Sequence, residues 1–335
     1  MKKNKSTFTR REFLQNSAKM AVVVSAAGLV SSLPAFAGEK TERGIMRRRL
    51  GKTGLDVSIL GFGGGSQFLM NPNGEWEKVM EAAIEAGINI FDTAPSYSAS
   101  SFNQGGAKSL DSEDRFGVIL PRYRDRIILS TKLESRNPEE AKSALEASLK
   151  RMKTDHVDIL FIHGILPTDS TADIEKGIYK TMVSFKSSGM VKNIGFSSMD
   201  SAERSKELIE KLDFDVVLLA MNATKYGDFE KIALPAALKK NIGVIGMKAM
   251  RDIVGKNATG KELLEHMWSH DGVSSVFVGH NGIQTIHENI SLANEFSKTG
   301  VSRIDRKELE LRMAGMAGPH VLSWARPGYR DNGLA

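Results

Sequence analysis

Four polar residues of different chemical type close or follow short apolar runs in the first half of the sequence. Asp92 ends one such run, and Tyr97 follows it by five residues. Lys132 and His163 each end a later run. A carboxylate, a phenol, an ammonium and an imidazole are groups that can hold or transfer a proton at neutral pH when their surroundings tune them. What they do together depends on whether the fold brings them to one place.

The elements that position these residues repeat one pattern. From Met46 onward, a short β-branched run is followed by a turn and an amphipathic stretch with apolar residues three and four positions apart, which predicts alternating strands and helices. The runs predict eight strands at residues 57–61, 88–92, 127–132, 157–163, 193–197, 216–220, 242–247 and 273–278. The stretches between them predict helices at residues 75–86, 138–152, 171–188, 202–211, 229–239 and 283–296.

Strands that read as continuous apolar runs are typical of a parallel sheet covered on its faces by helices. Eight such units favour a (β/α)8 TIM barrel over an open doubly wound sheet. Residues 47–59, with Gly51 and Gly54 between two β-prone runs, predict an N-terminal β-hairpin. We expect a signal peptide at 1–37, a barrel domain at 46–296 and a tail at 297–335 that packs on the barrel.

In such a barrel the reactive groups sit at the carboxyl ends of the strands. Each of the four residues also has an ordinary interpretation: Asp92 as a helix cap, Tyr97 as a loop aromatic, Lys132 as a solvated charge and His163 as a core histidine. Together they are harder to explain in this way, because burying them without mutual pairing would cost several kcal/mol. We therefore expect one catalytic cluster.

The order and spacing of Asp92, Tyr97, Lys132 and His163 resemble the catalytic tetrad of the aldo-keto reductase superfamily. The runs at 149–160 and 188–197 and the pair Glu288-Asn289 match flanking motifs of that family. The resemblance covers residues 46–296. It implies an NAD(P)H-dependent reduction of an aldehyde or ketone by hydride transfer. Tyr97 would be the general acid, tuned by Lys132 and Asp92, and His163 would orient the carbonyl.

The cofactor side departs from the family pattern. Ser197-Ser198 stands where similar proteins have Ser-Asn, and Leu218 aligns with a glutamine. The stretch 279–289 carries no Lys or Arg that would clamp a 2′-phosphate. The resemblance still favours NADP(H) over NAD(H), without a metal or an iron–sulfur cluster. The predicted cofactor contacts are Ser197, Ser198, Lys248, Gly279, Glu288 and Asn289.

Residues 98–108 form an insertion relative to the family, rich in Ser and Gly. It is either a substrate-facing loop or a disordered surface insertion.

The N-terminus has the order of a secretory signal: basic residues, an apolar run at 20–30, then small residues up to Ala37. Arg10-Arg11, followed by Glu12 and then Phe13-Leu14, resembles the twin-arginine export signal. This predicts cleavage near Ala37, the twin-arginine translocase as a partner, and a periplasmic or otherwise exported protein. An uncleaved anchor is the alternative, but the apolar run is shorter than the roughly 20 residues that a span needs.

Charge and cysteine content narrow the function classes. Residues 1–37 hold six Lys/Arg and one Glu, so the net charge of +6 falls to +1 without them. A nucleic-acid partner and a stable membrane anchor are therefore not expected. The chain has no cysteine, which excludes disulfides, thiolate metal sites and iron–sulfur clusters.

Two other functions stay open from the residues alone. Lys132 could form a Schiff base in a lyase or aldolase. The barrel could also be a catalytically silent, exported binding module. Borohydride trapping separates the first from a reductase, and ligand binding without turnover would indicate the second.

Overall fold

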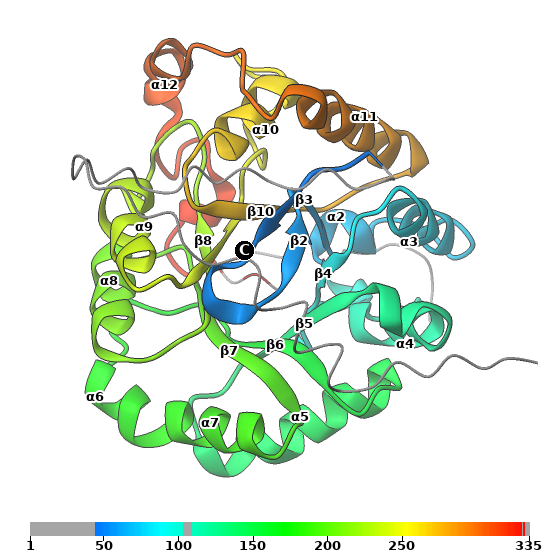
Figure 1. Ribbon diagram of the computed structural model, residues 1–335, viewed down its shortest axis with the longest axis vertical. Coiled ribbons are helices and arrows are strands. Elements are labelled where there is room, and N and C mark those ends of the chain that lie inside the picture. The colour runs from blue at the N-terminus through cyan, green and yellow to red at the C-terminus, as the bar shows by residue number, and fades with distance from the viewer. Residues whose placement is uncertain (1–43, 103–108, 330, 332–335) are drawn as a thin grey trace, which may run out of the picture. The chain divides into compact units, whose positions relative to one another are not determined.

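The computed structural model describes residues 44–102, 109–329 and 331. Eight parallel strands close into a barrel in the order β10-β3-β4-β5-β6-β7-β8-β9 (Figure 1). This is the predicted (β/α)8 TIM barrel. The barrel strands are β3 (Leu60–Gly63), β4 (Ile90–Asp92), β5 (Ile128–Leu133), β6 (Val157–Ile162), β7 (Val191–Ser198), β8 (Val216–Ala220), β9 (Gly243–Met247) and β10 (Val273–Val278).

Helices lie between successive strands and surround the barrel (Figure 1). Three predicted helices, at 138–152, 202–211 and 229–239, have the bounds that the apolar pattern indicated. The helices between the strands are α2 (Ser66–Leu69), α3 (Trp76–Glu85), α4 (Ser112–Tyr123), α5 (Pro138–Met152), α6 (Thr171–Ile174), α7 (Lys180–Ser187), α8 (Ala202–Lys211), α9 (Phe229–Lys239), α10 (Gly260–Trp268) and α11 (Ile283–Thr299), with π-helical η4 (Glu175–Tyr179) and the 3-10 turns η2 (Ala99–Phe102) and η3 (Arg124–Arg126).

Local sequence signals explain why helices begin where they do. Asn137 caps α5 by accepting a hydrogen bond from the backbone N–H of Glu139 at 3.0 Å, and Pro138 occupies the first turn. Thr259 and Glu262 form a reciprocal capping box at the start of α10. These caps set the direction in which each helix returns along the barrel.

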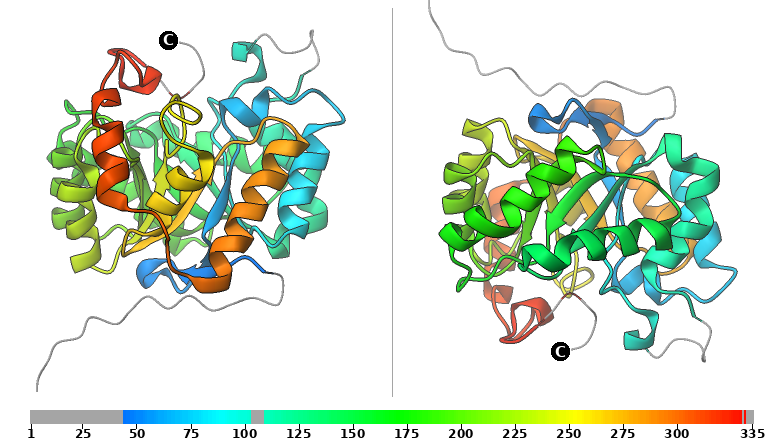
Figure 2. Two further views of the ribbon diagram at one scale, coloured as in Figure 1. Left: turned by 90° about the horizontal axis from the view of Figure 1, so that it is seen from above. Right: turned by 90° about the horizontal axis from the view of Figure 1, so that it is seen from below.

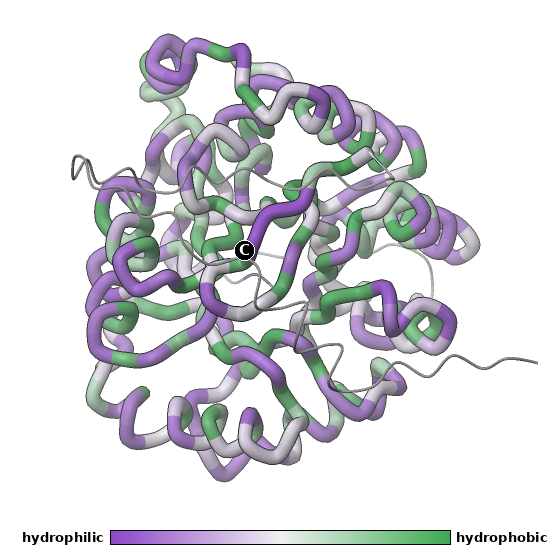
Figure 3. Tube along the Cα trace, in the orientation of Figure 1, coloured by the Kyte–Doolittle hydropathy of each residue, from purple (hydrophilic) through white to green (hydrophobic). Residues whose placement is uncertain are grey.

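The core has the distribution expected for a barrel covered by helices. Every residue of β4, β6, β8, β9 and β10 is buried. Figure 3 shows hydrophobic residues along the strands and hydrophilic residues on the outer turns of the helices. Strands buried on both faces are the reason that the sequence shows runs rather than alternation.

The predicted first barrel strand, 57–61, was wrong in its bounds. β2 (Asp56–Ser58) pairs antiparallel with β1 (Arg47–Arg49), joined by η1 (Gly51–Thr53), and these form the predicted N-terminal hairpin. The barrel strand β3 starts only at Leu60 and pairs with β4 and β10. One apolar run therefore contains strands of two sheets. The hydrophobic pattern does not show where the first strand ends and the second begins.

The segment after α11 lies against the barrel. It contains α12 (Arg306–Met313), η5 (Ala314–Met316) and η6 (Ser323–Ala325). Met313, Leu322 and Trp324 are buried with Ile245 and Met247 of β9. Figure 2 shows the hairpin and the η5–η6 segment at opposite ends of the barrel.

Two sequence predictions fall on residues that are not described. The signal segment 1–37 and most of the predicted insertion, 103–108, lie outside the described residues. Within the part of the chain that is described, no helix has the length and hydropathy needed to cross a bilayer.

Candidate active site

Asp92 and Lys132 meet at the carboxyl end of the barrel. β4 and β5 pair in a register that sets Asp92 opposite Ser130, and this brings the side chain of Lys132 toward Asp92. The Lys132 ammonium lies 2.6 Å from Oδ2 of Asp92, and Ser130 donates to Oδ1 at 2.7 Å. Lys132 also donates to the carbonyl of Thr93 at 2.8 Å. Both charged side chains are almost fully buried, so each depends on the other for its charge.

Tyr97 is brought to this pair by a tight turn after β4. Its backbone N–H donates to the carbonyl of Ala94 at 3.2 Å, with Pro95 at the turn position that favours proline. The Lys132 ammonium lies 3.1 Å from the phenolic oxygen and 4.6 Å from the ring centroid. The phenolic oxygen therefore accepts from Lys132 and keeps its own proton free to donate elsewhere.

His163 directly follows β6 and completes the cluster. Its ring centroid lies 5.9 Å from that of Tyr97, edge to face. Nδ1 lies 2.7 and 2.9 Å from the two carboxylate oxygens of Glu134, which also accepts from Ser96 at 2.6 Å. Nε2 is buried and has no hydrogen bond among the described residues. An unsatisfied ring nitrogen is therefore available to a bound carbonyl oxygen.

The C-terminal segment brings a third carboxylate to the same cluster. Tyr97 donates its phenolic proton to Oδ2 of Asp331 at 3.4 Å, and Nε2 of His163 lies 4.0 Å from the same atom. Oδ1 accepts from Lys248 and, at 3.2 Å, from Tyr329. Asp331 thus lies between the catalytic cluster and the end of β9.

The electrostatics of the cluster follow from burial and these carboxylates. Burial raises the pKa of Tyr97 well above its usual value, and Asp331 and Asp92 add to the effect. Burial disfavours a charged His163, but its contacts with Asp331 and Glu134 outweigh this and raise its pKa. Burial also opposes the charge of Glu134, but bonding to His163 and Ser96 lowers its pKa to about 2. The site therefore favours a neutral phenol, and its carboxylates favour the imidazolium form of His163.

A cavity of about 340 Å³ opens beside Tyr97 and Asp92. Two of the predicted cofactor residues, Lys248 and Gly279, line it. Leu218 lines it as well, at the position where the sequence comparison expected a glutamine. Burial lowers the pKa of Lys248, although the neighbouring Asp331 opposes this. An elongated ligand entering this cavity meets a buried cation close to the phenol.

The other predicted cofactor residues are placed differently. Ser197 is buried, and its hydroxyl accepts from the backbone N–H of Gly164 at 2.8 Å. Ser198 is also buried and donates to the carbonyl of Ser201 at 3.4 Å. On α11, Glu288 is exposed, and the Asn289 amide lies 3.2 Å from Nδ1 of His280. None of these four lines the cavity.

The described part of the insertion begins close to Tyr97. Ser98 and the backbone N–H of Ala99 both donate to Oδ1 of Asp111 at 2.8 Å. These bonds hold the start of the segment against the beginning of α4.

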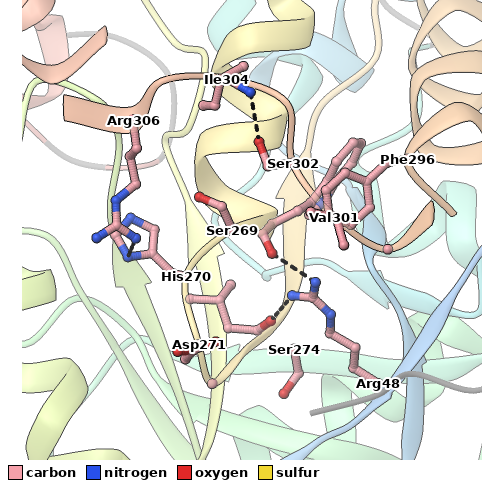
Figure 4. A pocket seen from close by; sticks show the side chains of 14 residues that line it. Arg48, Ser269, His270, Asp271, Ser274, Phe296, Val301, Ser302, Ile304 and Arg306 are labelled. Atoms are coloured by element: carbon pink, nitrogen blue, oxygen red, sulfur yellow. Dashed lines mark hydrogen bonds between the residues drawn. The ribbon is translucent and has the colours of Figure 1, made fainter. Parts of the chain in front are cut away.

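A cavity of about 420 Å³ lies at the other end of the barrel, where β10 begins (Figure 4). Arg48 extends into it and donates to the carbonyls of Val273 and Trp268, both at 2.8 Å. This arginine ties the hairpin to the end of α10. The cavity shares no residue with the tetrad.

Three potential metal ligands meet outside the barrel, where Glu230, His266 and His270 bring ligand atoms within 4.8 Å of one another. Lys225 already pairs with Glu230 at 3.2 Å and with Glu310 at 3.3 Å, and Glu310 lies 3.1 Å from Nε2 of His266. These contacts make the cluster part of an ion-pair network between α9, α10 and α12.

A family model described as "Aldo/keto reductase family" matches residues 60–263. The chain belongs to the aldo/keto reductase family. Enzymes of this family are NAD(P)-dependent oxidoreductases that act on small carbonyl compounds, which confirms the enzyme class that the tetrad indicated.

Named relatives of this aldo/keto reductase are distant. The uncharacterized oxidoreductase YqkF of Bacillus subtilis is 25% identical over 300 residues, covering 74% of this chain and 91% of that protein. L-galactose dehydrogenase of Arabidopsis thaliana is 23% identical, covering 78% and 92%. Among solved structures, the holo form of a Bacillus halodurans aldo-keto reductase has a TM-score of 0.63 at 19% identity, covering 84% of this chain and 99% of that one. The structural match shows the fold.

Sequence reasoning missed several residues of this reductase's site. Glu134 lies two residues after Lys132 and was visible as a polar residue at a strand end. Arg251, Tyr329 and Asp331 carry no such signal. Arg251 lines the cavity and donates to Ser66 at 2.6 Å, and its guanidinium lies 5.7 Å from the Tyr329 ring.

Proposed function

We propose that the protein reduces an aldehyde or ketone with NADPH, and that Tyr97 donates the proton. The observation that carries this proposal is the position of the phenol. Its oxygen accepts from Lys132, and its proton is directed into the cavity, where Oδ2 of Asp331 now accepts it. A substrate carbonyl oxygen in place of that carboxylate oxygen would receive the same proton.

The surrounding residues have separate roles in this scheme. Lys132, held by Asp92, stabilises the phenolate that remains after proton transfer. His163 directs Nε2 toward the same point and stabilises the negative charge that develops on the carbonyl oxygen. Since Glu134 holds the Nδ1 proton, Nε2 can donate only when the ring is an imidazolium. When bound, a reduced nicotinamide supplies the hydride.

The cavity fits a dinucleotide through its cations. Lys248 and Arg251 line it together with Gly279, and either cation could pair with a phosphate of the ligand. Both nucleotides carry phosphates that these cations could pair with, so the choice of NADPH rests on the family resemblance. The predicted contacts Ser197, Ser198, Glu288 and Asn289 do not line the cavity, so they take no part in this proposal.

Lys132 is poorly suited to the alternative Schiff-base chemistry. Its ammonium already has three acceptors within 3.1 Å, in Asp92, Thr93 and Tyr97, and its side chain is 1% exposed. An amine nucleophile must lose a proton and reach a carbonyl carbon. The pairing favours a lysine that stays charged. A silent binding barrel is the remaining alternative, and turnover separates it from a reductase.

Titration of the protein lacking residues 1–37 with NADPH and NADH tests the cofactor. We expect nicotinamide fluorescence to report saturable binding, tighter for NADPH. Oxidation of the bound nucleotide by p-nitrobenzaldehyde or another carbonyl compound then tests the reaction. Absence of binding to either nucleotide would contradict the proposed function.

We also propose that the N-terminal segment directs export through the twin-arginine pathway to the periplasm. The support is the Arg10-Arg11 motif and the small residues ending at Ala37. Mass spectrometry of periplasmic protein should find a chain starting at Gly38, with a dinucleotide bound if the protein is exported after loading. Retention of full-length chain in the cytoplasm, unchanged by Arg10→Lys and Arg11→Lys together, would contradict export.

A further inference from the structure

The last described residues are firmly attached before they reach the active site. Trp324 is buried, and its ring packs edge to face on Tyr226 with centroids 5.5 Å apart. Asp252, in the loop after β9, accepts from both the backbone N–H and the hydroxyl of Ser323 at 2.7 Å. These contacts fix the segment beside the cavity, so only a few residues separate the anchor from Asp331.

Asp331 makes the contacts that a bound anion would make. One carboxylate oxygen accepts from Lys248 and Tyr329, and the other accepts from Tyr97 and faces Nε2 of His163. The side chain of Asp331 is 15% exposed and that of Lys248 is 7% exposed. This carboxylate therefore fills the position that the proposed function gives to a substrate carbonyl oxygen.

The buried ammonium of Lys248 allows Asp331 to be exchanged only for another anion. A buried ammonium is stable only beside a negative charge. Asp331 is its ion-pair partner among the described residues. Tyr329 offers only uncharged contacts, a hydroxyl that accepts from Nζ at 3.4 Å and a ring whose centroid lies 5.1 Å away. When Asp331 leaves, another anion must take its place. A neutral ligand would leave the ammonium buried and unpaired.

We propose that Asp331 is an intramolecular ligand of the active site, released when a phosphate-class oxyanion of the dinucleotide takes over Lys248. This inference rests on the proposed function. Before release, the carboxylate excludes a carbonyl compound from Tyr97 and His163. The C-terminal segment thus keeps the site closed to substrate until the cofactor is bound, which imposes an order of binding.

Hydrogen exchange at residues 326–329, between the Trp324 anchor and Asp331, tests the release without any turnover. The probe is inorganic pyrophosphate added to the protein lacking residues 1–37. We expect pyrophosphate to accelerate exchange at residues 326–329, where the Tyr329 N–H donates to the Arg326 carbonyl at 3.1 Å, while exchange around the Trp324 anchor stays slow. Asp331→Asn should show the faster exchange without any ligand. Unchanged exchange in both cases would overturn the proposal. Acceleration by acetate but not by pyrophosphate would also overturn it, because the displacing anion would then be a carboxylate.

Asp200→Asn is the matched control. Asp200 is an exposed carboxylate that interacts electrostatically with Lys248, but it lies outside the C-terminal segment. We expect Asp331→Asn to tighten pyrophosphate binding about tenfold by removing the internal competitor. Asp200→Asn should leave the segment's exchange unchanged and tighten binding much less. Equal tightening in the two variants would mean that only a repulsive charge was removed, which overturns the proposal.

A third variant separates this inference from the proposed function. Lys248→Met removes the cation that both anions share, so pyrophosphate should no longer accelerate exchange in it. If pyrophosphate releases the segment but neither nucleotide binds, the dinucleotide part fails together with the proposed function, while the internal ligand stands. If NADPH binds and is oxidised while exchange at 326–329 stays slow, the reductase stands and the internal ligand is excluded.

Discussion

Nδ1 of His163 lies 2.7 Å from a carboxylate oxygen of Glu134, while Nε2 of the same ring is buried and has no hydrogen bond among the described residues. The carboxylate thus selects the protonation state of the imidazole. A neutral ring bound to Glu134 through Nδ1–H has only a lone pair at Nε2. Only the imidazolium can donate to a substrate from that atom.

We therefore predict that Glu134→Gln changes the pH dependence of reduction. When Asp331 is released, Glu134 is the carboxylate that remains to raise the pKa of His163 and favour its imidazolium. Activity that requires it is present below this pKa and is lost as pH rises through it. Removing the charge of Glu134 lowers the pKa, so the loss begins at lower pH. The pH profile of kcat/KM measures this.

Glu140→Gln serves as the control, since this exposed carboxylate lies at the start of α5 and bonds to Asn137. Its pH profile should match the wild type. A Glu134→Gln profile with the same descending limb as the wild type would show that the carboxylate does not govern His163.

We predict that Lys132→Met lowers the free energy of unfolding by more than it would if the charges of Lys132 and Asp92 did not interact. The substitution leaves the carboxylate of Asp92 buried with only the Ser130 hydroxyl on one oxygen. Breaking a buried pair costs about 3–5 kcal/mol in the free energy of unfolding. The double variant Lys132→Met with Asp92→Asn should recover part of that loss, because no charge is left unpaired. Urea unfolding of Lys132→Met, Asp92→Asn and the double variant measures the coupling, and additive losses would argue against a buried ion pair.

Gly117 in α4 tests the packing of α4 on α5. A Cβ at this position would lie 2.0 Å from the carbonyl oxygen of Arg151. Relief of such a contact moves backbone, so we expect Gly117→Ala to lower the free energy of unfolding by about 1–3 kcal/mol. Gly315→Ala, where a Cβ meets nothing within 4 Å, should change it little. Equal stability of the two variants would contradict the close approach of the helices.

Much of the fold could be predicted because each strand of the barrel is buried on both faces. Continuous apolar runs and capped helices such as α5 follow from that burial alone. The start of β3 could not be predicted in this way, since β2 and β3 share one apolar run. Whether such a run forms one strand or is divided between two sheets depends on the strands with which it pairs, and these are distant in the sequence. Hydrophobic periodicity carries no information about those pairing partners.

The residues of the candidate site also differ in whether the sequence could predict them. Asp92, Lys132 and His163 stand at strand ends, where a barrel gathers its polar groups, so the sequence predicts that they meet. Asp331 reaches the site from a segment without regular apolar periodicity, held by contacts such as that between Ser323 and Asp252. Lys248 was expected to meet a phosphate, but the partner that it has in the structure depends on tertiary packing of the tail.

The central claim is that Tyr97 donates the proton during hydride transfer to a carbonyl. Its most direct test is the rate of NADPH oxidation by an accepted aldehyde in Tyr97→Phe, compared with the wild type, after nucleotide titration has shown that the variant still binds NADPH. Loss of a positioned general acid should lower kcat by about 10²–10⁴-fold. A Tyr97→Phe protein that binds the nucleotide and keeps the wild-type rate would contradict the account.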